Sequence, residues 1–86
     1  MTAEVTVSPK QFKLFLGEVV RPRGVMWTFS IDDPEDALLL FDSIKDACVV
    51  ALKVAKNLGT PQAVSIWIRR MGEEWRLKVA GDCPDH

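Results

Sequence analysis

Residues 42–59 read DSIKDACVVALKVAKNLG and form the one strongly periodic stretch of the chain. At 100° per residue the apolar side chains fall on one face and the lysines opposite, which indicates an amphipathic helix. Asp42 or Ser43 can cap the first turn, Asp46 follows Ser43 as in a capping box, and Gly59 can end the helix in a left-handed conformation. A helix of about four turns is marginal alone in water, so its apolar face must lie on a sheet.

Length and composition predict one domain over residues 1–86. Of the 86 residues, 48% are hydrophobic and 27% charged, a balance typical of a globular chain with one modest core. The net charge of −1 excludes a global positive field that would recruit nucleic acid or an anionic membrane. Residues 1–10 are expected to form a loose arm or an added edge strand, and residues 81–86 a polar tail.

The N-terminal sequence and the cysteines predict a cytoplasmic protein that does not contact a membrane. The first residues lack a basic segment followed by an apolar one, and no apolar run approaches the ~20 residues that span a bilayer. Cys48 lies on the apolar helix face and Cys83 in the tail, which makes them a poor disulfide pair and, with one histidine, a poor metal site. Free thiols are therefore expected.

Alternating residues before the helix predict a first hairpin. Residues 11–20 form a strand with a bulge at Gly17, residues 21–24 form a turn, and residues 25–31 form the returning strand. Residues 32–41 are ambiguous, because their acidic start with Pro34 also resembles the first turn of a helix. The apolar run 37–41 is too short for a substantial helix, which favours an acidic turn leading into a short buried strand.

A second hairpin is predicted after the helix, from residues 63–70 and 74–80. An even loop centred on Met71 and Gly72 would set Ile68 opposite Trp75 and Ile66 opposite Leu77, all on one face. A three-residue loop would instead place Ile68 opposite Arg76, so the apolar pattern favours the even register.

These elements predict an α+β fold. One amphipathic helix packs on one face of an antiparallel sheet of four or five strands, in the order β-β-(β)-α-β-β. The predicted core comprises Leu14, Leu16, Trp27, Phe29, Ile31, Phe41, Ile44, Ala47, Cys48, Ala51, Ala55, Leu58, Ile66, Ile68, Trp75 and Leu77.

The chain also resembles a family of small uncharacterised bacterial domains. The likeness covers residues 25–80 and consists of a Trp-bearing strand, a Phe-capped alanine-rich helix and a final hairpin. It rests on Trp27, Phe29, Phe41, Asp42, Asp46, Ala47, Ala51, Ala55, Gly59, Val64 and Ile66. The resemblance implies this order of elements and no activity. Trp67 and Cys83 depart from the family's pattern.

The residues point away from catalysis. The single histidine, His86, is the last residue, and neither a metal-ligand spacing nor a glycine-rich phosphate loop occurs. We therefore expect no enzyme activity, no cofactor, no metal and no small-molecule ligand. The acids between Asp32 and Asp42 could be a cation site or an acid pair, but their spacing favours a solvated acidic turn.

One surface is unusual, the sheet face predicted to point away from the helix. It would gather aromatic, sulfur and basic side chains: Lys13, Phe15, Met26, Trp67, Arg69, Arg76 and Lys78. Such a mixture favours contact with another protein or with a second copy, most simply as a homodimer. The alternatives are single-stranded nucleic acid stacked on Trp67, and Trp67 packed under Arg76 with no further role.

Overall fold

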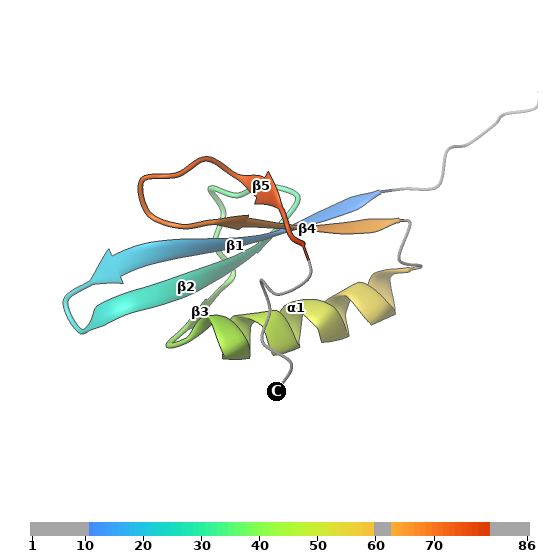
Figure 1. Cartoon of the computed structure of the whole chain (residues 1–86). Helices are drawn as coiled ribbons and strands as arrows, with labels where there is room; N and C mark the ends of the chain where they lie inside the picture. The colour runs from blue at the N-terminus through green and yellow to red at the C-terminus, as the bar shows by residue number, and fades with distance from the viewer. Residues whose placement is uncertain (1–10, 60–62, 80–86) are drawn as a thin grey trace, which may run out of the picture.

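A computed structural model describes residues 11–59 and 63–79, in which one helix packs on a five-stranded sheet (Figure 1). The predicted α+β class is confirmed. The predicted arm at residues 1–10 and tail at residues 81–86 lie outside the described residues. In chain order the elements are β1 (Phe12–Arg21), β2 (Gly24–Ile31), β3 (Leu39–Phe41), α1 (Ile44–Leu58), β4 (Val64–Arg69) and β5 (Arg76–Leu77).

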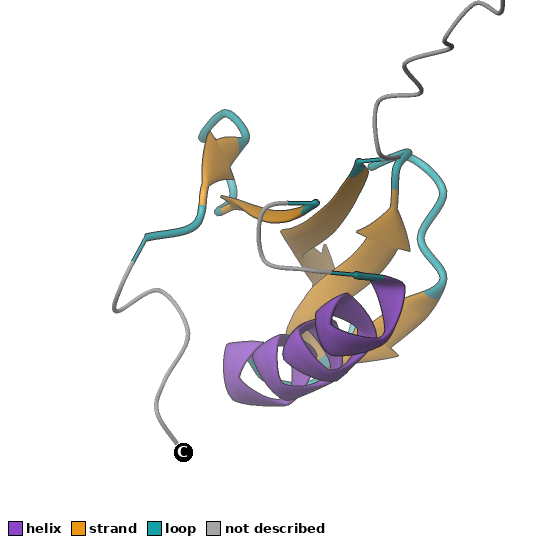
Figure 2. Ribbon diagram, turned by 90° about the vertical axis from the view of Figure 1, so that its right-hand side faces the viewer, coloured by secondary structure: helices purple, strands orange, loops and turns teal. Residues whose placement is uncertain are grey.

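The sheet is mixed, so the prediction of a purely antiparallel sheet is wrong. Its strand order is β3-β2-β1-β4-β5, and β4 runs parallel to the central strand β1, with Leu14 beside Ile66. The other neighbours pair antiparallel. Parallel neighbours need a long connection, and here β2, β3 and α1 lie between β1 and β4 in the chain. Figure 2 shows α1 covering one face of the sheet.

The caps of α1 agree with the sequence at its start and differ at its end. Ser43 is the N-cap, and its hydroxyl accepts a hydrogen bond from the Asp46 amide at 3.2 Å. Gly59 has φ 161° and ψ −158°, which is extended backbone, and its amide donates to the Ala55 carbonyl at 3.2 Å. The predicted left-handed stop at Gly59 is therefore wrong.

The core lies between α1 and the facing side of the sheet. Its buried residues are Leu14, Leu16, Trp27, Phe29, Ala47, Cys48, Ala51 and Ile68, and partly buried Ile31, Phe41, Ile44, Val54, Ala55, Leu58, Val64 and Ile66 pack against them. Two predicted core residues are absent from it, since Trp75 is half-buried elsewhere and Leu77 is 52% exposed.

Cys48 is buried in this core and is not a free thiol. Only 1% of its surface is exposed, and its sulfur is disulfide-bonded. The expectation of a free thiol at Cys48 is therefore wrong. Cys83 lies outside the described residues.

The hairpin of β4 and β5 adopts the register that the sequence argument rejected. Ile68 pairs with Arg76 and Trp67 with Leu77. A turn closes it with a bond of 3.0 Å from the Glu73 amide to the Arg70 carbonyl, and Gly72 supplies φ 81°, the positive value that a type II turn needs at its third position. This register turns Trp75 to the side of the sheet opposite α1. On that side its ring packs against Phe15 and Gly17 of β1.

The first hairpin is regular, so the predicted bulge at Gly17 is wrong. β1 and β2 pair without interruption from Leu14 opposite Ile31 to Arg21 opposite Gly24. Packing, and not a bulge, explains why residue 17 is a glycine. A Cβ added to Gly17 would lie 3.0 Å from Trp75 Cη2 and 3.1 Å from Thr28 Oγ1, so the missing side chain makes room for the indole.

The ambiguous segment 32–41 contains a strand, β3, as predicted, but this strand is not buried. Leu39 and Leu40 are 48% and 41% exposed at the edge of the sheet. The preceding turn starts at Asp32, whose φ of 63° is left-handed. Asp32 holds that turn to β1, because its carboxylate accepts from the Lys13 amide at 3.0 Å and its amide donates to the Lys13 carbonyl at 2.7 Å.

Candidate interaction surface

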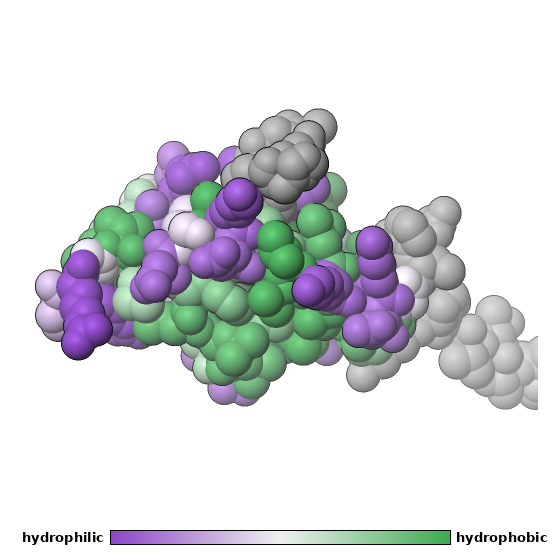
Figure 3. Space-filling view, turned by 90° about the horizontal axis from the view of Figure 1, so that it is seen from below, coloured by the Kyte–Doolittle hydropathy of each residue, from purple (hydrophilic) through white to green (hydrophobic). Residues whose placement is uncertain are grey.

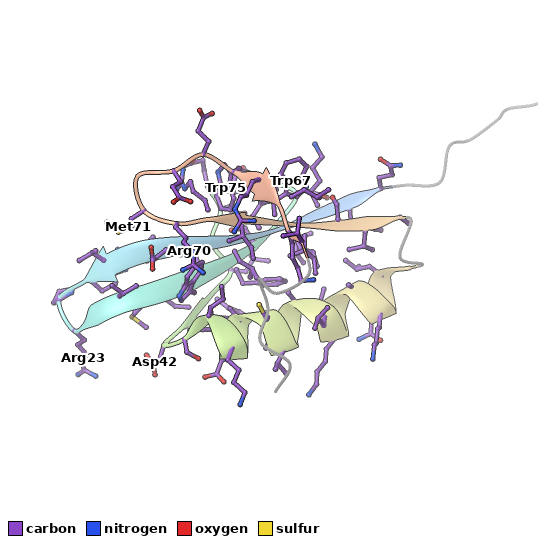
Figure 4. The ribbon with its side chains drawn as sticks, in the orientation of Figure 1. Arg23, Asp42, Trp67, Arg70, Met71 and Trp75 are labelled. Atoms are coloured by element: carbon purple, nitrogen blue, oxygen red, sulfur yellow. The ribbon has the colours of Figure 1, made fainter. Side chains whose placement is uncertain are left out.

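The sheet face turned away from α1, called the outer face below, carries five of the seven predicted surface residues. Strand alternation places five of them on this side: Lys13, Phe15, Met26, Trp67 and Arg69. Phe15 pairs with Ser30 of β2, which lies on the same face. Figure 4 shows Trp67 and Trp75 on the side of the sheet away from α1.

The other two predicted surface residues, Arg76 and Lys78, lie in register with the helix side of the sheet. Arg76 pairs with Ile68, and the Lys78 amide donates to the Ile66 carbonyl at 2.8 Å. Residues directly opposite each other share a face, so these two cations align with core residues rather than with Trp67. The four basic residues expected on one surface are thus divided between two.

Trp75 closes much of the outer face. Its ring meets the Phe15 ring edge to face, with 5.0 Å between centroids and 73° between planes, and its far edge fills the space above Gly17. Phe15 is consequently 7% exposed and Thr28 8% exposed. A flat apolar patch centred on Phe15, as a homodimer through this face would need, is covered by the chain itself.

Both outer-face indoles carry a cation over the ring. The Lys13 ammonium lies 5.7 Å from the centre of Trp67, and the Arg69 guanidinium lies 4.7 Å from the centre of Trp75. Trp67 Nε1 also donates to Ser65 Oγ at 2.9 Å. Trp67 is thus held in place on one side by a hydrogen bond and approached by Lys13, and it stays half-buried.

Arg70 forms a contact on the helix side that the sequence argument missed. Its guanidinium lies 5.5 Å from the ring centre of Trp27, and the following amide, of Met71, donates to Glu18 Oε1 at 3.0 Å. These contacts tie the turn after β4 to the first hairpin. Figure 4 labels Arg70 and Met71 at this turn. The contact of Arg70 with Trp27 depends on β4 lying parallel to β1, and the alternation of residues does not reveal that direction.

The most exposed apolar run is at the opposite edge of the sheet. Leu38, Leu39 and Leu40, called the β3 edge below, are 54%, 48% and 41% exposed. Within the described ranges β3 pairs with β2 alone. The Leu38 amide donates to the Phe29 carbonyl at 2.8 Å, so the backbone of Phe29 faces β3. Leu39 lies directly opposite Phe29 and is turned into the sheet, so by strand alternation the peptide groups of Leu40 point away from it.

Acidic residues surround the β3 edge. Residues 32–46 hold six of the twelve Asp and Glu side chains of the chain and a single Lys. All six are exposed. Asp33 Oδ1 caps the Glu35 amide at 2.9 Å, a turn contact. Across residues 11–59 and 63–79, no three Asp, Glu, Cys or His side chains are grouped so as to hold a metal ion.

The helix side is also partly apolar. Figure 3 views the molecule from the side of α1 and shows apolar surface over much of it, between charged groups. On α1 itself, Val49 and Leu52 are each 42% exposed. In the part of the chain that the structure describes, α1 is too short and too polar to cross a bilayer, and no other helix occurs.

Comparisons of the chain with models of known families, with curated proteins and with solved structures gave no match. The resemblance to small bacterial domains therefore stays a prediction.

Proposed function

We propose that this protein is a non-catalytic protein-interaction module that binds an extended segment of another protein along the β3 edge. The observation that carries the proposal is the exposure of three consecutive leucines in and next to β3, an edge strand that pairs only with β2 among the described residues. An edge strand presents unpaired amides and carbonyls to an incoming strand, and such β-augmentation is a recurring mode of peptide recognition.

The contact surface proposed here is the edge of the sheet and not its outer face. Phe15, one of the residues predicted on the contact surface, is 7% exposed, whereas every residue of the β3 edge is more than 40% exposed. Leu40 belongs to the β3 edge and also lies on the outer face, because it pairs with Thr28, which is on that face.

Selection from a random peptide library tests the proposal without a known partner. Selected peptides are titrated onto wild type, onto Leu40→Pro, which removes an outward amide, and onto Leu52→Ser, which changes a leucine of similar exposure on α1. We expect a loss of at least about tenfold in affinity with Leu40→Pro and no change with Leu52→Ser. Thermal melts of both variants check that they fold.

Amide chemical shifts of the wild-type protein give a second readout that needs no variant. Bound peptide should shift the amides of residues 37–42 most. Shifts centred on Val49 and Leu52, or on Trp67, would place the site elsewhere and contradict the proposal.

Single-stranded nucleic acid is the second candidate. Its support is the half-buried Trp67 with Lys13 beside it and Arg69 on the same face. Arg76 and Lys78 are in register with the helix side of the sheet and do not extend this surface. Few phosphates can therefore be contacted, and binding of an oligonucleotide should be weak and salt-dependent. Tryptophan quenching by oligonucleotides that persists in 150 mM salt and is lost in Trp67→Ala would rank this function first.

The cytoplasmic location stays a separate proposal. The disulfide at Cys48 bears on it, because the reducing cytoplasm seldom maintains such bonds. Acid-quenching of cells, alkylation of the denatured protein and mass spectrometry of the peptide containing Cys48 test it, because Cys48 is buried in the folded protein. A cytoplasmic protein should yield alkylated Cys48, and a bonded Cys48 would place the chain in an oxidising compartment.

A further inference from the structure

The charges around the β3 edge identify the kind of segment that it would bind. Asp36 and Asp42 flank the exposed leucines six residues apart, which is at most about 20 Å in an extended chain. Both side chains are exposed, and Asp42 lies just before the start of α1 (Figure 4). A strand laid along the edge would therefore meet an acid near each of its ends.

This arrangement opposes pairing with a second copy. Two β3 strands paired antiparallel through the outward groups of Leu40 would set Asp42 of each copy opposite Leu38 of the other, with Asp36 as its diagonal neighbour on the same face. Like charges close together across two paired strands repel each other, and charges at an edge are a common protection against self-pairing. The same acids attract a strand of opposite charge.

Resting on the proposed function, we infer that the partner is an extended segment with alternating apolar residues in its middle and Lys or Arg at both ends. The apolar middle covers the leucines of the β3 edge, the backbone continues the sheet, and the basic ends meet Asp36 and Asp42. Because both ends of the edge are acidic, charge alone selects neither a parallel nor an antiparallel direction.

Three synthetic peptides with one core test the inference. The basic peptide is Lys-Lys-Val-Thr-Val-Thr-Val-Lys-Lys, and the other two replace every Lys by Gln or by Glu. Amide shifts of the wild-type protein give the affinity and the location together. We expect the basic peptide to shift residues 37–42 and to bind about tenfold more tightly than the Gln peptide, the order expected of two exposed ion pairs. The Glu peptide should bind weakest.

A matched pair of protein variants separates the effect of Asp36 and Asp42 from the effect of the protein's total negative charge. Asp36→Asn with Asp42→Asn removes the flanking acids, and Glu73→Gln with Glu74→Gln removes two exposed charges at the turn between β4 and β5. We expect the preference for the basic peptide to fall to less than about threefold in the first variant and to persist in the second. Raising the salt from 20 to 500 mM should reduce the preference in wild type as well.

The outcomes distinguish this inference from the proposed function. If the Gln and basic peptides bind the β3 edge equally, the inference is wrong and the proposed function stands. A preference that survives the removal of Asp36 and Asp42 also overturns it. If none of the three peptides shifts the β3 edge and the library yields no edge-dependent binder, both are wrong.

Discussion

At the scale of single residues, two hydroxyls of the outer sheet face differ in their hydrogen bonds. Ser30 is fully buried, and its Oγ has no hydrogen-bond partner among the described residues, whereas Ser65 Oγ accepts from Trp67 Nε1 at 2.9 Å. Burial of an unpaired hydroxyl is costly, but a paired hydroxyl contributes net stability.

Opposite effects are therefore expected when each serine is replaced by alanine. Ser30→Ala should raise the free energy of unfolding by about 1 kcal/mol, and Ser65→Ala should lower it by about 1 kcal/mol. Urea denaturation of both variants measures the difference. Equal destabilisation by the two substitutions would mean that Ser30 is hydrogen-bonded in solution.

Gly17 controls where Trp75 can lie. Gly17→Ala places a methyl group 3.0 Å from the indole, so we expect a loss of about 1–3 kcal/mol and a red-shifted tryptophan emission as Trp75 moves into water. Gly59→Ala is the matched control, because its new Cβ would make an ordinary contact of 3.6 Å with Ala63. Unchanged stability and emission in Gly17→Ala would contradict the packing of Trp75 on β1.

At the scale of elements, α1 depends on the burial of its small residues. Ala51 is fully buried, so Ala51→Asp places an unpaired charge in the core and should cost about 3 kcal/mol or more. The next residue, Leu52, is 42% exposed, and Leu52→Asp should cost less than about 1 kcal/mol. A thermal melt of Ala51→Asp that matches wild type would contradict the placement of the helix.

The helix could be predicted because its signal is local. Its period, its Ser43 cap and its buried face follow from residues within four positions of one another. The direction of β4 could not be predicted in this way, because alternation of apolar residues is the same in a parallel and an antiparallel strand. It is the long connection through α1 that returns β4 beside β1.

The position of Trp75 was missed for a related reason. Both registers of the last hairpin are compatible with its own residues, and the choice follows from Phe15 and Gly17, more than fifty residues earlier, which together receive the indole. The exposure of Leu38 to Leu40 was missed because a continuous apolar run is read as buried. The acids on both sides of that run were the available sign of an exposed edge.

At the scale of the whole molecule, the acids near the β3 edge should keep the protein monomeric. We expect sedimentation to give the monomer mass at ~100 µM in low salt, a concentration at which a stable dimer would be populated. Any self-association through this edge should grow as salt screens the repulsion and should be reduced by Leu40→Ser. A dimer that is present in low salt and insensitive to Leu40→Ser would indicate another contact.

The parallel pairing of β1 with β4 has a consequence for the synthesis of the chain. Phe12 pairs with Val64, 52 positions later (64 minus 12), so the central strand is translated long before one of its two neighbours. At about 5–20 residues per second, β1 waits about 3–10 s for that partner. During this interval Leu14 and Leu16 lack their cover from β4, and the nascent chain is most open to aggregation or chaperone binding before β4 has left the ribosome.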